Sequence, residues 1–310
     1  MLEVDVGNKI NYTHLNPQMR YAADLSSEER ISRIRSERWI GYALAQDAVA
    51  KLESLFNHPQ KLRMPNILII GPTNNGKSMI IERFRRAHQP YEKINEDGLT
   101  EIQIPLLTMQ MPSDPTIARF YALLIHAMHA PVSMRSKVAD LETVALDLMR
   151  KCNVRMLIID ELHNMLAGRR NIQGEFLNLI RFLGNELRIP IVCIGIREAW
   201  HAICTDPQLE NRFSPLILPL WQNDSEYGKL LASFVSTFPL RKPSNILDED
   251  TRNYILRRSE GTIGEISSLL TKAAIAAINS GDEYIDISIL ELTDYESPTE
   301  RRRQFERELI

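Results

Sequence analysis

One stretch of eight residues limits what this chain can fold into more than any other feature of the sequence. It reads Gly71, Pro72, Thr73, Asn74, Asn75, Gly76, Lys77 and Ser78, and it fits the pattern G-x-x-x-x-G-K-[ST]. An apolar run over residues 66–70 precedes it, and a helical pattern over residues 78–87 follows it. In this context glycines let backbone N–H groups wrap a phosphate chain at a helix N-terminus. A glycine-bearing surface turn is the alternative, but such a turn does not require the flanking strand and helix.

The residue types in this loop assign a role to each part of it. We expect all eight residues to bind a nucleotide. Lys77 would reach the β- and γ-phosphates and so take part in catalysis, and the Ser78 hydroxyl would bind Mg²⁺. ATP and Mg²⁺ are therefore the predicted cofactors.

A second apolar run, over residues 156–159, ends in Asp160 and Glu161. We expect Asp160 to hold Mg²⁺ through its water shell beside the nucleotide, and Glu161 to orient and polarise the attacking water. Acids at a strand end also cap the next helix, which is the alternative. The phosphate loop about 80 residues upstream favours the catalytic interpretation. Glu161 then predicts an ATPase that hydrolyses ATP to ADP and phosphate, rather than a protein that only binds it.

Strand patterns alternate with helical patterns in the first two thirds of the chain. Apolar runs at 66–70, 102–109, 154–159 and 191–196 are typical of strands buried on both faces. This alternation predicts an α/β fold with a parallel, doubly wound sheet. After Pro219 only helical patterns occur. We therefore expect four parts: an N-terminal arm and helix over 1–45, a P-loop core over 46–220, a small all-α lid over 221–292 and a charged tail over 293–310.

Charge and cysteine content narrow the partners and the compartment. The net charge of −3 is unlike that of a strongly basic nucleic-acid binder, so any DNA contact would come from local basic patches. Cys152, Cys193 and Cys204 lack metal-ligand spacing and are typical of buried thiols, which fits a reducing cytoplasm. No run of about 18 apolar residues occurs, so no membrane span is expected.

Several stretches together resemble the AAA+ ATPases and, more closely, the TniB/TnsC group of transposition regulators. The two nucleotide motifs are general to P-loop ATPases. The stretches that narrow the resemblance are Leu183-Gly184-Asn185-Glu186-Leu187 and Gly195-Ile196-Arg197-Glu198-Ala199. Further support comes from Arg38-Trp39-Ile40-Gly41-Tyr42, Arg63-Met64-Pro65-Asn66 and Leu209-Glu210-Asn211-Arg212-Phe213, so the resemblance covers roughly residues 30–280.

The resemblance implies an ATP-dependent DNA-binding regulator of transposition with an AAA+ core and a helical lid. Such proteins assemble with themselves as rings or helical filaments on double-stranded DNA. They link a TniQ-type target selector to a DDE transposase and do not themselves cut or join DNA. Arg212 matches the arginine finger, whose guanidinium would reach the γ-phosphate held by the neighbouring subunit. An intramolecular salt bridge at a helix end is the alternative for Arg212.

The chain departs from the AAA+ pattern at two points. The fourth strand ends without the usual polar sensor residue, and Arg197 is the nearest candidate. The lid helix has Glu265 where many AAA+ proteins place an arginine, while Gly261 and Gly264 would permit a close approach to adenine. Gln110 either couples DNA contact to Glu161 or is an ordinary surface residue.

The DNA-contacting residues are predicted from basic side chains in regions that face the channel in this group. They are Arg119, Arg135, Lys137, Arg169 and Arg170. Phosphate contacts by these side chains would be independent of sequence and sensitive to salt, and a solvated charged face is the alternative for each. Trp39 and Tyr42 either pack in a core or lie near the adenine.

Two rival functions share the same core. An origin-recognition-like replication initiator or helicase loader is the first, although such proteins often append a winged-helix domain, for which residues 281–310 are too few. The second is a signalling NTPase whose hydrolysis is indifferent to DNA.

Overall fold

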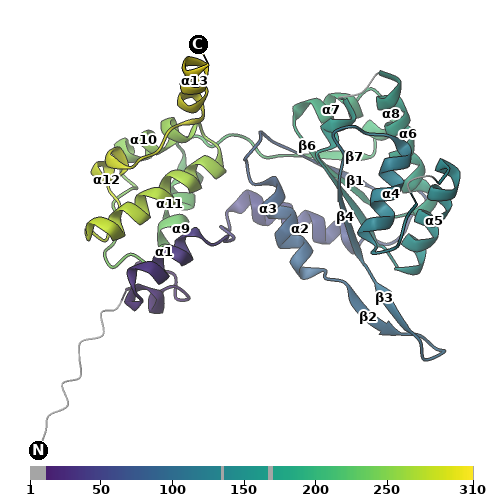
Figure 1. Ribbon diagram of the computed structural model, residues 1–310, viewed down its shortest axis with the longest axis horizontal. Coiled ribbons are helices and arrows are strands. Elements are labelled where there is room, and N and C mark those ends of the chain that lie inside the picture. The colour runs from purple at the N-terminus through teal and green to yellow at the C-terminus, as the bar shows by residue number, and fades with distance from the viewer. Residues whose placement is uncertain (1–11, 134–135, 167–169, 310) are drawn as a thin grey trace, which may run out of the picture. The chain divides into compact units, whose positions relative to one another are not determined.

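The computed structural model describes residues 12–133, 136–166 and 170–309, and the chain forms two compact units (Figure 1). One unit is Leu44–Pro219, which carries the phosphate loop and is called the core unit below. The other combines Met1–Ala43 with Leu220–Ile310 and is called the helical unit.

A five-stranded parallel sheet forms the centre of the core unit. In spatial order its strands are β4 (Leu106–Gln110), β5 (Met156–Asp160), β6 (Ile191–Gly195), β1 (Asn66–Ile70) and β7 (Phe213–Ile217). The three inner strands are almost entirely buried, as their runs of Ile, Leu and Val require. The sheet confirms the predicted α/β class with parallel strands.

Helices cover both faces of this sheet (Figure 1). They are α2 (Ala43–Phe56), α3 (Lys77–Ala87), α4 (Ile117–Ala127), α5 (Val138–Lys151), α6 (Arg170–Leu187), α7 (Arg197–Ile203) and α8 (Pro207–Glu210), with a 3₁₀ helix, η2 (Leu162–Leu166). The crossover from β1 to β4 runs toward one edge of the sheet, and the later crossovers run back toward the other. Because such crossovers are right-handed, α3 lies on one face and α4 to α6 on the other. The direction changes beside β1, and in open α/β sheets ligands bind at the carboxyl ends of the strands beside such a point.

Two strands of the core unit differ from the sequence prediction. The strand predicted over 102–109 is interrupted at Pro105, which cannot donate a ladder hydrogen bond. The residues before it form β3 (Thr100–Gln103), which pairs antiparallel with β2 (Tyr91–Ile94) in a separate hairpin. The sequence pattern also fails to predict β7, because Ser214 and Pro215 break its apolar run. An edge position tolerates this proline.

The helical unit is a small all-α domain with one apolar core. Its elements are η1 (Arg20–Asp24), α1 (Ser27–Arg35), α9 (Ser225–Ser236), α10 (Glu249–Ser259), α11 (Ile263–Ser280), α12 (Ile287–Leu292) and α13 (Pro298–Glu308). Side chains from five of these helices meet in the core, namely Ile34, Tyr227, Ile255, Leu269 and Leu290. Among the described residues no single helix has both the length and the apolar composition to cross a membrane; only α10 and α11 together pass that test, as a pair bent by 116°.

A buried ion pair joins α1 to the segment that follows α11. Arg30, which is 1% exposed, donates from both terminal nitrogens to Glu283 at 2.6 and 2.7 Å. It also donates to the carbonyl of Pro239 at 3.2 Å. The sequence predicts residues 1–45 as a part separate from the lid, whereas the described residues from 12 to 43 fold with the C-terminal helices.

The charged tail begins as a helix that is tied to α10 and α11. Glu265 accepts hydrogen bonds from the Tyr295 hydroxyl and from Arg301, each at 2.6 Å. Arg258 on α10 pairs with Glu300 at 2.5 Å. The carboxylate of Glu265, at the position where many AAA+ proteins have an arginine, therefore holds the tail of its own chain.

Candidate functional site

The phosphate loop is shaped by two glycines and one buried amide. A Cβ atom on Gly71 would lie 2.8 Å from the carbonyl oxygen of Leu218, so only glycine fits there. Gly76 has φ 83°, a left-handed conformation that favours glycine, and it caps α3. The side-chain amide of Asn75, 3% exposed, donates to the carbonyls of Leu218 and Pro219 at 2.9 Å each. The loop is thereby anchored to the chain that follows β7.

Lys77 lies inside the curve of this loop. Its amine donates to the carbonyls of Gly71 at 2.8 Å and Pro72 at 2.6 Å, and the residue is 8% exposed. Burial lowers the pKa of Lys77, while the negative charges of Glu161 and Asp160 act in the opposite direction. The loop, the cation and the acid pair therefore form one electrostatically coupled site.

The acid pair stands at the carboxyl end of β5. Asp160 Oδ1 accepts the Glu161 amide at 2.7 Å, and Glu161 has φ 54°, which is unusual for a residue with a side chain. The pKa of Asp160 is raised above its usual value, because burial and the negative charge of Glu161 outweigh the effects of the Glu161 amide and Lys77, which lower it. Backbone strain of this kind concentrates at functional sites.

The Glu161 carboxylate has a partner that the sequence analysis did not predict. His163 Nε2 lies 3.0 Å from Glu161 Oε2. The other ring nitrogen of His163 is buried and has no hydrogen-bond partner among the described residues. His163 is the second residue of the 3₁₀ helix η2, which begins at Leu162, and this helix sets its position.

The residues at the end of β1 and β5 suit a magnesium ion. Ser78 is exposed in the first turn of α3, and Asp160 is partly exposed with one carboxylate oxygen committed to the Glu161 amide. Hydroxyl and carboxylate oxygens are the hard ligands that Mg²⁺ prefers beside phosphates. The donor set therefore fits the predicted ion.

Arg212 lies at the amino end of the sheet's strands, whereas the phosphate loop lies at the carboxyl end of β1. Its carbonyl accepts the amide of Asn66, the first residue of β1, at 2.9 Å. The loop begins only after the last residue of β1. Because a strand rises about 3.3 Å per residue, roughly 16 Å separates the start of β1, where Arg212 lies, from the start of the loop. Arg212 Nη1 donates to Asn185 Oδ1 on α6 at 2.8 Å, and the side chain is partly buried. Arg212 is thus held in place but is not brought to the phosphate loop of its own chain.

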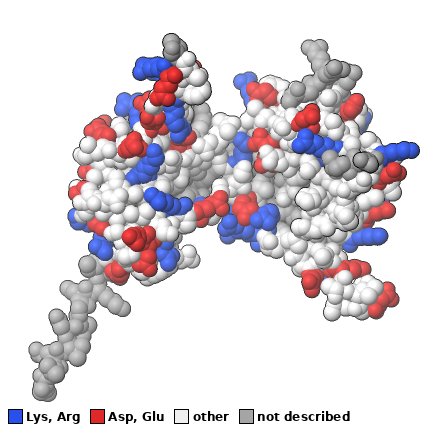
Figure 2. Space-filling view, viewed as in Figure 1, with Lys and Arg blue, Asp and Glu red and all other residues white. Residues whose placement is uncertain are grey.

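The predicted DNA contacts fall in several places. Arg119 and Lys137 are exposed, on the first turn of α4 and at the N-cap of α5. Arg170 begins α6. Arg135 and Arg169 lie outside the described residues. The β2–β3 hairpin, by contrast, carries Glu92, Glu96, Asp97 and Glu101, and its surface shows red and white atoms in Figure 2.

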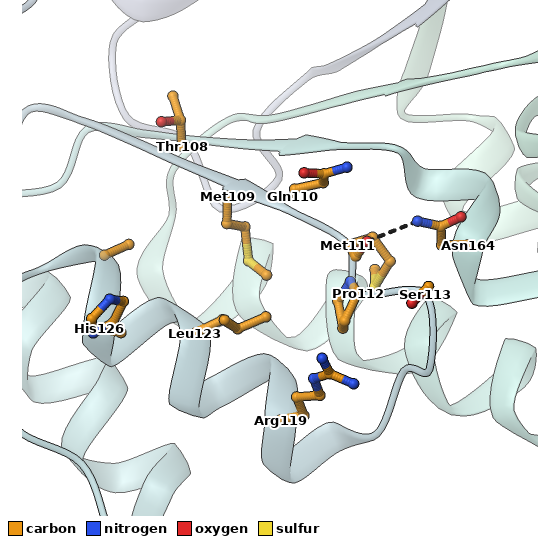
Figure 3. A pocket seen from close by; sticks show the side chains of 11 residues that line it. Thr108, Met109, Gln110, Met111, Pro112, Ser113, Arg119, Leu123, His126 and Asn164 are labelled. Carbon is orange, nitrogen blue, oxygen red and sulfur yellow. Dashed lines mark hydrogen bonds between the residues drawn. The ribbon is translucent and has the colours of Figure 1, made fainter.

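Gln110 and Arg119 line a cavity of about 460 Å³ between the end of β4 and α4 (Figure 3). Gln110 is exposed and stands beside Asp160 in the sheet register. Arg119 donates to the carbonyl of Asp114 at 3.3 Å and points from α4 toward Pro112 (Figure 3). Asn164 in η2 donates to the carbonyl of Met111 at 2.9 Å, which joins this cavity wall to the segment after Glu161.

The other sensor candidates have these positions. Arg197 is exposed at the first residue of α7. Gly261 adopts φ 72°, and a Cβ there would lie 3.0 Å from the carbonyl of Trp221. Tyr42 packs edge-on against Trp221 at 5.1 Å between ring centroids, and Trp39 is partly buried. Tyr42 therefore packs against the core of the helical unit, which fits the first of the two alternatives for it.

Solved structures with a similar fold support this architecture. The ORC2 protein of Aeropyrum pernix, solved as ADPNP–ADP complexes, is 16% identical, with a TM-score of 0.54 over 84% of this chain and 70% of that chain. The ORC1 protein of Aeropyrum pernix in complex with DNA is 14% identical, with a TM-score of 0.54 over 84% and 68%. Cdc6p from Pyrobaculum aerophilum is 14% identical, with a TM-score of 0.55 over 82% and 67%. At such identities the similarity concerns the fold alone. A comparison with curated proteins found no match.

The parallel sheet, the loop around Lys77 and the acid pair define a nucleotide-binding ATPase of the P-loop class with the AAA+ fold. The family model described as "Bacterial TniB protein" matches residues 30–223 of the chain. The match spans more than half of the chain, which belongs to the TniB family. The family resemblance inferred from the sequence is confirmed.

Three contacts that support the site were not predicted from the sequence: the anchoring of the loop by Asn75, the contact of His163 with Glu161 and the contact of Asn185 with Arg212. Asn185 lies in the Leu-Gly-Asn-Glu-Leu stretch that narrowed the resemblance, and that stretch was the available signal for its contact with Arg212. His163 comes two residues after Glu161 in sequence, which was the signal for its contact with Glu161.

Proposed function

We propose that this protein is an ATP-dependent regulator of DNA transposition that assembles on double-stranded DNA. ATP would bind at the phosphate loop of one subunit, and Arg212 of a neighbouring copy would complete the catalytic site around it. Hydrolysis would then weaken the assembly, so that the protein acts as a timed platform rather than a motor. In that role it would link a TniQ-type target selector to a DDE transposase.

The chemistry follows from groups that already lie together in the core unit. The amine of Lys77 would exchange its contacts with the Gly71 and Pro72 carbonyls for phosphate oxygens, which are charged and therefore stronger acceptors. Ser78 and Asp160 would hold Mg²⁺, which supplies charge neutralisation at the phosphates. Glu161 would orient the attacking water and accept its proton.

The observation that carries the proposal is the separation of Arg212 from its own phosphate loop. The backbone of Arg212 is fixed at the start of β1, whereas the loop follows its end, and roughly 16 Å of strand lies between them. An arginine side chain does not span that distance within its own chain. The guanidinium is held by neutral Asn185 on α6, and a contact with the phosphates of a second copy is compatible with this arrangement.

DNA is the proposed partner of the assembled form. Support comes from the TniB family and from exposed cations on α4 and α5, Arg119 and Lys137. Arg135, Arg169 and Arg170 remain predictions. Contacts through these cations would depend on salt and not on base sequence.

A mixing experiment tests the shared site. Arg212→Ala subunits keep an intact phosphate loop, and Lys77→Ala subunits keep an intact arginine. Each variant alone should hydrolyse ATP poorly, and their mixture should recover part of the wild-type rate per subunit. Arg83→Ala, an exposed arginine on α3, serves as a control for general charge loss. No recovery in any ratio of the two variants would count against a site shared between copies.

A replication initiator or helicase loader is the second candidate, because the solved structures of similar fold include ORC1, ORC2 and Cdc6p. The two candidates differ in what the ATP-bound form does. A transposition regulator should form continuous assemblies along duplex DNA of any sequence, visible by electron microscopy, and should retain a DDE transposase on that DNA. Discrete particles at one site, without retention of the transposase, would favour the initiator.

A further inference from the structure

A second cavity of the core unit gathers cations around Arg212. It has a volume of about 580 Å³ and lies between the segment that leads into β1 and the segment from α8 to β7. Three basic side chains line it: Lys61, Arg63 and Arg212. His58 and polar residues of the second segment, Gln208, Asn211 and Ser214, complete the wall.

These cations have no acidic partner within the described part of the chain. No carboxylate there lies within ion-pair distance of Lys61, Arg63 or Arg212, and the guanidinium of Arg212 is held only by the neutral amide of Asn185 at 2.8 Å. Asp206, whose negative charge acts to raise the pKa of Arg212, is already paired with Arg181 at 3.1 Å. Burial lowers the pKa of Arg212, and the positive charges of Arg63 and Arg181 lower it further. The cavity therefore concentrates positive charge that its own chain does not neutralise.

The backbone of both cavity walls is fixed by hydrogen bonds. Met64 is 3% exposed, and its sulfur accepts the amide of Lys61 at 3.2 Å, which fixes the turn before β1. The amide of Asn66 donates to the Arg212 carbonyl, and its side-chain oxygen accepts the amide of Ile191 at 2.9 Å. Both walls are thus built onto the sheet, and the exposed side chains of Lys61 and Arg63 extend from a fixed backbone.

We propose that this cavity binds the phosphate chain of the ATP held by a neighbouring copy, with Lys61 and Arg63 acting beside Arg212. The inference rests on the proposed function and extends it from one residue to a site. A nucleoside triphosphate carries several negative charges, and one arginine neutralises only part of them. Arg63 offers a planar, bidentate donor and Lys61 a compact charge, and these are complementary ways to hold phosphate oxygens.

The shape of the site favours a nucleotide over DNA. A duplex presents its phosphates as an extended line and is usually met by an open basic surface. Here the three cations line one concave space at the amino end of the strands. Binding of DNA phosphates is the competing outcome, and the experiment separates the two.

The test uses the full chain and the double variant Lys61→Ala/Arg63→Ala, with Arg83→Ala as the matched control. At protein concentrations too low for assembly, a fluorescent ATP analogue should bind the double variant as it binds the wild type, because the cavity acts only on the ATP of a neighbouring copy. Hydrolysis per subunit at high protein concentration should fall about tenfold or more, since preorganised cations act on the transition state. Mixing with Lys77→Ala subunits, which keep both cations, should restore part of the rate.

Three results would overturn the inference. If the double variant hydrolyses ATP like Arg83→Ala while the wild type still assembles, the cavity has no part in the shared site and the proposed function stands. If the double variant keeps its DNA-free hydrolysis but loses DNA affinity with a flatter salt dependence, the cavity binds DNA instead. If wild-type hydrolysis per subunit is independent of protein concentration and ATP causes no assembly, the proposed function falls together with the inference.

Discussion

The ring of His163 holds the carboxylate of Glu161, with 3.0 Å between Nε2 and Oε2. Glu161 occupies a left-handed backbone conformation, so its side chain starts from an unusual direction and gains from a fixed partner. The contact leaves the second carboxylate oxygen available to a water. His163 thereby acts as a positioning residue for the predicted base.

Replacing His163 should slow the chemical step and leave nucleotide binding intact. In His163→Ala we expect kcat to fall about tenfold and KM to change little, because the carboxylate loses its orientation but the phosphate loop does not change. His163→Gln, which can still donate a hydrogen bond, should recover part of kcat. Equal losses in both variants, or a change in KM alone, would contradict a positioning role.

Glu161→Gln should bind ATP with unchanged affinity and hydrolyse it roughly 10²–10⁴ times more slowly, since the amide cannot accept the proton of the attacking water. Single-turnover hydrolysis and a fluorescent nucleotide titration measure the two properties separately. Glu198→Gln, an exposed acid on α7, is the control. Unchanged turnover in Glu161→Gln would remove Glu161 from the catalytic step.

Asn75→Ala should destabilise the core unit and weaken nucleotide binding together. The substitution leaves the carbonyls of Leu218 and Pro219 without their donor in a buried place, which costs about 1–3 kcal/mol. Chemical denaturation and ATP titration check the two effects. Asn57→Ala, which removes an exposed amide contact with the Glu53 carbonyl, should change neither by a comparable amount.

The Arg30–Glu283 pair should make the stability of the helical unit depend on pH. Burial alone would raise the pKa of Glu283, but the hydrogen bond from Arg30 and the Arg241 amide outweigh it and hold that pKa below its usual value. A folded pKa below the unfolded one means that this stabilisation is fully present above about pH 4.3 and is lost as the pH falls through the folded pKa.

Urea denaturation across this pH window provides the measurement. Because Trp39 and Trp221 lie in the helical unit and Trp200 in the core unit, a Trp200→Phe background makes fluorescence report the helical unit alone. Arg30→Ala should cost about 3–5 kcal/mol at neutral pH, because the buried Glu283 loses its main partner and keeps only the Arg241 amide and a 4.0 Å contact with the Arg241 guanidinium. The cost should shrink in acid, and a cost that is constant with pH would show that the pair does not control this stability.

Local patterns explain what was predictable from the sequence. The strand before Gly71 and the strand that ends at Asp160 are continuous apolar runs, and the phosphate loop has a fixed spacing, so each is visible within a few residues. The class of fold follows from their alternation with helices. The edge strand β7 was not visible, because Pro215 interrupts a pattern that only the pairing with β1 reveals.

Contacts between distant segments account for most of the rest. Arg30 and Glu283 lie 253 positions apart, and nothing in either stretch announces the other. The partnership of Arg212 with Asn185 likewise depends on how α6 packs beside the start of β7. The resemblance pointed to both stretches, but only the folded chain brings the two side chains together.

Arg212 and the phosphate loop lie at opposite ends of the strands of one sheet, which has a consequence for how an assembly of copies grows. If each copy contributes its arginine at one end of the strands and receives an arginine at the other end, the contact is heterologous, and copies add head to tail. An open assembly then has two unlike ends. One terminal subunit holds ATP that no neighbour completes, while the other presents an arginine with nothing to act on. Hydrolysis would start in the interior of the assembly and would not occur at the end whose ATP has no neighbour. Disassembly would then have a direction, and that direction would follow from the separation of the two sites by the five residues of β1.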